Sequence, residues 1–174
     1  WEALDISVRN TLFGDGKHSA VRWKIMLENT GTEPHSMTLL LATRPFSISQ
    51  NPAPICGIRA QRGRWLWVNN EPFMVAATPA SETGAGALLE SMTAALHGRA
   101  PAKNSISAAT AADGVAVWVY PVELRPSQSA EFHFAFPSAP GENFPPVDVS
   151  IDDRMHETVS LWEEATGVLK VTLP

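Results

Sequence analysis

Cysteine is nearly absent from this sequence of 174 residues, which has Cys56 alone. An intramolecular disulfide is therefore excluded, and so is a zinc site built from several thiolates. Charged residues are also scarce, at 18% of the chain, against about 25% in typical soluble domains. A surface with so few charges is typical of a domain that hides part of itself against a larger assembly.

Several functional classes lack their sequence signals. The net charge is −5 and no run of lysine and arginine occurs, so we expect no nucleic-acid partner. No apolar run approaches about 18 residues, so we expect no membrane span. The five histidines have no metal-binding spacing, and no nucleophile or phosphate-loop motif is present. We therefore predict no metal, no cofactor and no catalytic residue, and we do not expect this chain to be an enzyme.

Alternation of apolar and polar residues is the main pattern that is present. A period of two is typical of strands with one buried and one solvated face. It recurs, with short polar turns between, in eight segments: 4–13, 21–28, 37–46, 57–68 with a turn at Gly63, 71–77, 105–109, 115–124 and 130–136. The first three predict a meander, and Asp113-Gly114 predicts a hairpin turn. The sequence thus predicts a mostly β fold, an antiparallel β-sandwich of supersandwich-like type with eight to ten strands and two short helices.

Two segments change to a helical period. Apolar residues in 85–96 recur at spacings of three and four and predict a short amphipathic helix. Ser150 begins a second helix, because Asp153 follows it in a capping-box pattern, and Trp162 is expected to dock that helix. Residues 137–146 contain four prolines, which predicts either a linker or a strap across the sandwich. We therefore divide the chain into a sandwich at 1–146 and a C-terminal helix plus strand at 147–174.

The chain contains six tryptophans. Two of them, with two neighbouring arginines, are the candidate binding residues. Trp65 and Trp67 share a strand face beside Arg62 and Arg64. Flat aromatic rings flanked by charged hydrogen-bonding groups can hold sugars. Large aromatic side chains also fill cores and interfaces between domains. For Trp65 and Trp67 we favour this structural role over sugar binding.

Four segments together resemble a known family. They are Leu-Leu-Leu-Ala-Thr-Arg-Pro-Phe at 39–46, Trp-Leu-Trp-Val-Asn-Asn at 65–70, the helix before His-Gly-Arg-Ala-Pro at 97–101, and Trp162 with Val-Leu-Lys-Val-Thr-Leu-Pro at 168–174. The pattern resembles the N-terminal β-sandwich domain of bacterial glycoside-hydrolase-like multidomain proteins, in which an (α/α)6 barrel follows. The resemblance implies an accessory domain whose partner is the neighbouring catalytic domain of the same polypeptide. Because the chain starts at Trp1 and ends in apolar residues, we expect a piece of a longer protein.

Three functions stay open at this stage. The first is a non-catalytic accessory domain that packs on and supports a neighbouring catalytic module. The second is a carbohydrate-binding module that uses Trp65, Trp67, Arg62 and Arg64. The third is an adhesion or oligomerisation module. A bacterial periplasmic or extracellular location is favoured slightly over a cytoplasmic one.

Overall fold

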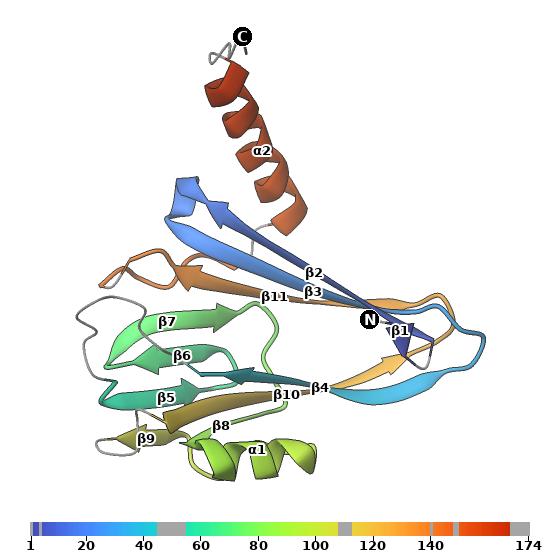
Figure 1. The fold of residues 1–174 in the computed structure, drawn as a ribbon, viewed down its shortest axis with the longest axis vertical. Helices are drawn as coiled ribbons and strands as arrows, with labels where there is room; N and C mark the ends of the chain where they lie inside the picture. The colour runs from blue at the N-terminus through green and yellow to red at the C-terminus, as the bar shows by residue number, and fades with distance from the viewer. Residues whose placement is uncertain are drawn as a thin grey trace, which may run out of the picture.

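Two antiparallel sheets face each other in the computed structural model, and one helix lies beyond each sheet (Figure 1). The structure describes residues 2–3, 5–44, 55–107, 113–139, 141–147 and 150–167. The prediction of a mostly β, antiparallel sandwich with two helices is confirmed. None of the helices in the described ranges is long and apolar enough to cross a membrane. The predicted strand at 168–173 lies outside the described residues.

The two sheets differ in size. The large sheet has eight strands in the order β1 (Glu2–Ala3), β2 (Ile6–Asp15), β3 (Ala20–Asn29), β11 (Ser129–Pro137), β7 (Glu71–Ala76), β6 (Trp65–Val68), β5 (Gly57–Gln61) and β9 (Ser105–Ser107). The small sheet has three strands in the order β4 (His35–Thr43), β10 (Gly114–Leu124) and β8 (Glu82–Ala87). The helices are α1 (Leu88–Leu96), α2 (Ile151–Gly167) and the short η1 (Gly16–His18).

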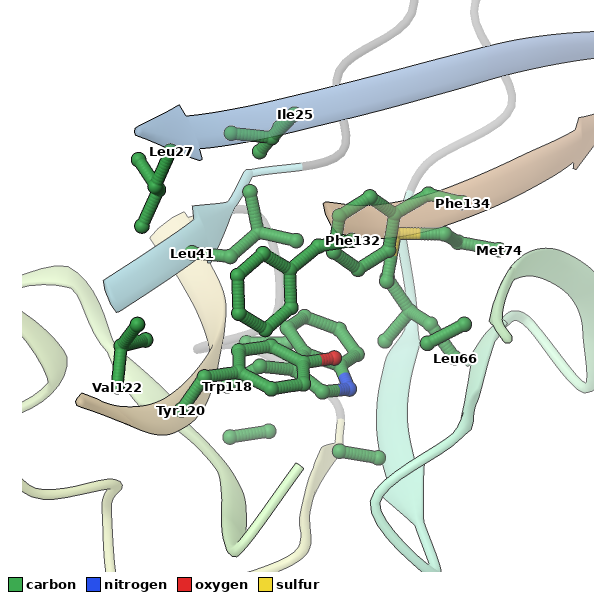
Figure 2. Close-up of a cluster of buried hydrophobic side chains, with 14 of the residues drawn as sticks. Ile25, Leu27, Leu41, Leu66, Met74, Trp118, Tyr120, Val122, Phe132 and Phe134 are labelled. Atoms are coloured by element: carbon green, nitrogen blue, oxygen red, sulfur yellow. The ribbon is translucent and has the colours of Figure 1, made fainter. Parts of the chain in front are cut away.

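Strand β10 shows how alternation builds the core. Its even-numbered residues, with Trp118 fully buried among them, point between the sheets and meet Phe132 and Phe134 of β11 (Figure 2). Its odd-numbered valines face outward and form a second small cluster, which Ala95 of α1 covers. The alternation places these two sets on opposite faces of the strand. Both faces are buried because the other sheet covers one and α1 covers the other.

Pro121 lies inside β10 without breaking its pairing. It stands opposite Thr38 in an unshifted register with β4, while the pairing of β10 with β8 stops at Val119. The carbonyl oxygen of Val119 accepts a hydrogen bond from Ser81 beside β8, so odd-numbered residues of β10 turn toward that side. The missing N–H of Pro121 therefore faces the side where β8 has ended. A proline is therefore tolerated here, because no strand of the described residues needs its N–H.

Two predicted connections are wrong. β4 pairs with β10 instead of extending the β2–β3 hairpin, and β10 forms no hairpin with β9, which belongs to the other sheet. The buried side chain of Asn29 explains the first crossing. It donates to the carbonyl oxygens of Glu33 and Leu124 and accepts from Gly31, which turns the chain toward the small sheet. A local polar turn does not reveal such a contact between segments 95 residues apart in the sequence.

The predicted helix at 85–96 begins three residues late. Residues up to Ala87 form β8, because they pair with β10 and admit the backbone of 101–103 alongside. A Cβ atom at Gly84 would lie 2.0 Å from the carbonyl oxygen of Pro101. Close backbone packing at a glycine thus overrode the helical periodicity.

The proline-rich stretch is a strap across the outer face of the large sheet. Phe144 packs edge-on against Trp67, and the carbonyl oxygen of Pro146 accepts a hydrogen bond from Arg22. The predicted cap of α2 is confirmed, since Asp153 N donates to Ser150 Oγ at 3.2 Å. The prediction that Trp162 docks α2 is wrong, because 64% of its surface is exposed.

Candidate functional site

Trp65 and Trp67 lie on the outer face of the large sheet, in strand β6. Leu66 between them points into the core and is fully buried, so alternation turns both indoles outward. The turn before β6 contains Gly63, which has a φ of 68° and packs on Ala80. Both indoles are half-buried. Their side chains therefore share a face, as the sequence predicted, without standing free in solvent.

Two aromatic and cationic neighbours enclose Trp67. The guanidinium carbon of Arg59 lies over its ring at 5.1 Å, and the Phe144 ring approaches edge-on with 4.9 Å between centroids. The indole Nε1 is buried and has no hydrogen-bond partner in the described part of the chain. Arg59 was missed by the sequence analysis, although its position opposite Trp67 follows from the β5–β6 hairpin register. Arg59 thus occupies one face of the ring that would stack on a sugar.

The two arginines beside the indoles have different roles. Arg64 points back to the end of β7, where Nε donates to Ala76 O at 3.1 Å and another guanidinium nitrogen donates to Ala77 O. Arg62 is exposed in the β5–β6 turn with a φ of 50°. The structure therefore gives Arg64 a backbone-bracing role and leaves Arg62 at the surface.

A shallow pocket of about 560 Å³ opens beside Trp67 and Arg59. Its remaining walls combine the apolar Ile58 and Ile106 with small polar side chains, including Asn70, Ser105 and Ser107. Asn69 also contributes, and its Oδ1 accepts hydrogen bonds from the backbone N–H groups of Cys56 and Gly57. An aromatic edge beside amides and hydroxyls has the donor and acceptor types that recognise a hydroxylated ligand.

A buried ionic cluster lies farther along the outer face. Asp15 and Arg22 are 2% and 1% exposed, and Arg22 Nε donates to Asp15 Oδ2 at 2.6 Å. His18 Nδ1 lies 2.9 Å from the same oxygen. Burial raises the pKa of Asp15, but hydrogen bonds from Arg22 and His18 outweigh it and lower that pKa below 3.8. The carboxyl group is therefore an anion that anchors both neighbours.

This cluster lacks the third member of a nucleophilic triad. In a triad, a carboxylate orients a histidine whose other ring nitrogen bonds to the nucleophilic hydroxyl or thiol. No such hydroxyl or thiol bonds to His18 within the described ranges. Arg22, the other partner of Asp15, donates to the carbonyl oxygen of Pro146 in the strap. The alternation of β3 predicted Arg22 on the solvated face, so its burial was not predictable without the strap. The geometry indicates a structural latch.

The remaining acids and histidines are spread out. Asp152 pairs with Lys24 at 2.6 Å, and the hydrogen bond to Asp152 is the main reason that the pKa of Lys24 is raised. His133 Nε2 lies 3.1 Å from Glu131 Oε2. No group of three metal-ligating side chains gathers in the parts of the chain that the structure describes.

Apart from Leu12 of β2, the exposed large apolar side chains of the described residues lie on the two helices. α1 turns Ser91 inward, where its hydroxyl donates to Val115 O at 3.1 Å, and its leucines turn outward. α2 is buried only at Ile151 among the residues described, while its later turns extend away from the sheets (Figure 1). Exposed large apolar residues on these two helices are Leu88, Leu89, Met92, Leu96, Val159, Leu161 and Trp162. Such clusters are typical of contact surfaces.

Comparison with protein-family models and with curated proteins gives no relative. The chain matches no protein-family model, and no curated protein matches it. The resemblance to glycoside-hydrolase-like proteins therefore rests on its sequence segments alone.

Proposed function

We propose that this chain is a non-catalytic accessory β-sandwich domain of a bacterial glycoside-hydrolase-like protein. It packs on a neighbouring catalytic module of the same polypeptide and supports that module. The single observation that carries the proposal is the exposed apolar surface of α1 and α2. A helix that exposes Leu161 and Trp162 while burying only its first turn is suited to a partner on its free side.

The attachment of α2 adds support. Its first half is held by Lys24 with Asp152, by Lys17 with Glu157, and by Thr158 with Gly14 O. Its second half, from Leu161 to Thr166, is exposed at every residue. A groove between this half and the β2–β3 turn has a volume of about 850 Å³ and apolar walls that include Phe13, Val159 and Trp162. The neighbouring module would fill this groove.

The test compares this chain alone with the longer polypeptide that carries the neighbouring module. Trp162→Asp leaves the stability of the isolated chain unchanged, because the side chain is already exposed. In the longer protein the same change weakens the interdomain contact by about 2 kcal/mol. Differential scanning calorimetry of both proteins measures the two effects.

Glu164→Ala is the matched control, since Glu164 is exposed on the same helix and is polar. It should change neither protein. Equal melting temperatures for wild type and Trp162→Asp in the longer protein would sink the proposal. Hydrolysis of aryl glycosides by the isolated chain, abolished by substitution of one of its carboxylates, would also contradict it.

The pocket beside Trp67 favours carbohydrate binding as a second candidate function. Its amide and hydroxyl lining suits sugar hydroxyls, and Trp67 supplies an apolar edge. Calorimetric titration with a glycan panel tests it. A binding function predicts heat with at least one glycan and loss of that heat in Trp67→Ala, whereas Arg125→Ala, which is exposed outside the pocket, serves as the control. Absence of heat across the panel would remove this candidate.

A further inference from the structure

The free edge of β4 presents an unpaired row of backbone groups. Even-numbered residues of β10 turn toward β4, because odd-numbered Val119 turns toward β8. Leu39, which is opposite Tyr120, therefore bonds to β10. Thr38, Leu40 and Ala42 alternate with it and direct their N–H and C=O groups away from β10. No backbone partner for them occurs in the described residues.

The other sheet edges are protected better. β9 has three residues, and the edge of β8 is closed by the bond from Ala85 N to Lys103 O. The edge of β2 is blocked by β1 at one end and by Thr158 of α2 at Gly14 O at the other. β4 has nine residues, and the stretch 36–43 has no charged residue and no proline. Natural proteins rarely leave such an edge unprotected.

The large sheet extends beyond this edge. Leu41 of β4 lies beneath Ile25 and Leu27 of β3 (Figure 2), so the next position in the small sheet lies beneath β2. The inner face of β2 there carries Val8, Asn10 and Leu12, which stand opposite Leu27, Ile25 and Trp23. Asn10 accepts a hydrogen bond from the Trp23 indole. Leu12 is 67% exposed although it points toward the sandwich interior. Among the described residues, the small sheet therefore has one strand fewer than the mostly apolar surface that it faces.

We propose that the β4 edge binds an extended segment of a partner protein as a fourth strand of the small sheet. The segment is uncharged, about six residues long, and apolar at every second position. Its backbone pairs with Thr38, Leu40 and Ala42, and its inward side chains cover Val8 and Leu12. This inference goes beyond the proposed function, which concerns the helices.

The overhang of β2 also decides against a second copy of this chain. Antiparallel pairing of two β4 strands would place both large sheets on the same side of one six-stranded sheet. The β3 strand of the copy, which covers its own β4, would then need the space that β2 fills. A single extended segment is thin enough to fit beneath β2, whereas a whole sandwich is not.

Amide hydrogen exchange followed by NMR tests the edge. In the chain alone, the amides of Thr38, Leu40 and Ala42 should exchange about 100-fold faster than those of Leu39 and Leu41. The probe is the peptide acetyl-Thr-Leu-Thr-Leu-Thr-Leu-Thr-amide, which should slow the three fast amides at least about tenfold. Slow exchange of those amides in the chain alone, or no slowing by the peptide, would overturn the proposal.

A proline at the edge is the matched perturbation. Ala42 is exposed, so Ala42→Pro removes an outward N–H and leaves the fold intact, while Ala42→Ser keeps the N–H. The proposal predicts about tenfold weaker peptide binding for Ala42→Pro only. The same peptide N-methylated along one edge should not bind, which tests the pairing without changing the protein. The proposal would be refuted if Ala42→Pro bound the peptide as tightly as wild type, or if the N-methylated peptide bound as tightly as the unmodified one. A wild-type dimer that Ala42→Pro dissociates would show that a second copy, and not a partner segment, binds this edge.

Discussion

The two helices are attached to the sandwich by different chemistry. α1 lies on the valine cluster of β10 through small residues, with Ala95 in contact and Ser91 bonded to Val115 O. α2 is held at its first half by ions and a strap, through the Asp15–Arg22 pair, Pro146 and the Lys24–Asp152 pair. Salt screens exposed ion pairs and so weakens them, whereas it does not weaken apolar packing. α1 is thus a fixed part of the domain, and α2 is an arm whose attachment depends on charge.

Both helices nevertheless turn apolar side chains outward. Leu89 and Leu96 are about as exposed on α1 as a side chain can be, at 80% and 84%. The comparison teaches that amphipathic periodicity identified each helix without identifying which face is buried. In α1 the buried face is the one that carries the small side chains of Ser91 and Ala95. A helix with small residues on one side can approach a sheet closely.

The largest effect is expected from Arg22→Ala. It leaves Asp15 as a buried carboxylate with only His18 beside it, and it frees the strap at Pro146. Breaking a buried ion pair on one side costs about 3–5 kcal/mol. Urea unfolding followed by tryptophan fluorescence measures the change. If the free energy of unfolding falls by less than about 1 kcal/mol, the Asp15–Arg22 pair and its bond to Pro146 do not hold the strap and α2 to the sandwich.

Acid should weaken the same latch. The pKa of Asp15 is lowered in the folded chain relative to 3.8. A group with a depressed folded pKa contributes stability above its unfolded pKa and loses it as the pH falls through the folded pKa. We therefore expect the stability to fall below pH 3.8 in wild type. Asp15→Asn should show a smaller acid dependence in the same range, and an identical dependence would rule Asp15 out as its source.

On the α1 side, Ser91→Ala should cost about 1 kcal/mol, because it deletes one buried hydrogen bond to Val115 O. The loss should be the same at low and high salt, in contrast with the contacts of α2. Thermal unfolding in dilute buffer and in concentrated sodium chloride checks both points. A salt-dependent loss would remove the distinction between the two helices.

A smaller effect is expected from Asp152→Asn, since Asp152 is 65% exposed and such pairs contribute less than about 1 kcal/mol. The hydrogen bond to Asp152 raises the pKa of Lys24 above 10.5. Stability from a raised pKa is present at lower pH and is lost as the pH rises through the folded value. In wild type, high salt at a fixed pH below 10.5 should therefore speed amide exchange in the first half of α2. The free energy of unfolding should also fall as the pH rises above 10.5, by more in wild type than in Asp152→Asn. Asp152→Asn should already exchange fast at low salt and respond less to added salt.

The smallest effect concerns the outward faces themselves. Leu89→Ser and Trp162→Ser should each change the stability of the chain by less than about 0.5 kcal/mol, because both side chains are exposed. Chemical denaturation of the two variants tests this. A large loss from either one would mean that its helix packs through that face.

The sequence predicted strands more reliably than their partners. The alternation in β10 identified its two faces, and Gly63 placed the β5–β6 turn, because both signals are local. The assignment of β4 to the small sheet depends on Asn29 reaching Leu124, which no local pattern records. Likewise, the strand at 85–87 depends on Pro101 lying beside Gly84.

The candidate site was predictable only in part. Strand alternation placed Trp65 and Trp67 on one face, and the structure agrees. Arg59 and Phe144 enclose Trp67 from a neighbouring strand and from the strap. The burial of Arg22 follows from the same strap. These features arise from long-range packing, which has no period in the sequence. Sugar binding at these residues stays a prediction.

The late position of β10 along the chain has a consequence for folding. Within the part of the chain that the structure describes, β4 finds its strand partner more than seventy residues downstream, as the register of Thr43 with Ala116 shows. During synthesis β4 therefore emerges long before β10 can pair with it. Loop closure over such a separation slows folding, and an unpaired strand invites aggregation meanwhile. A ribosome-bound nascent chain that stops before Gly114 should thus be a substrate for holding chaperones.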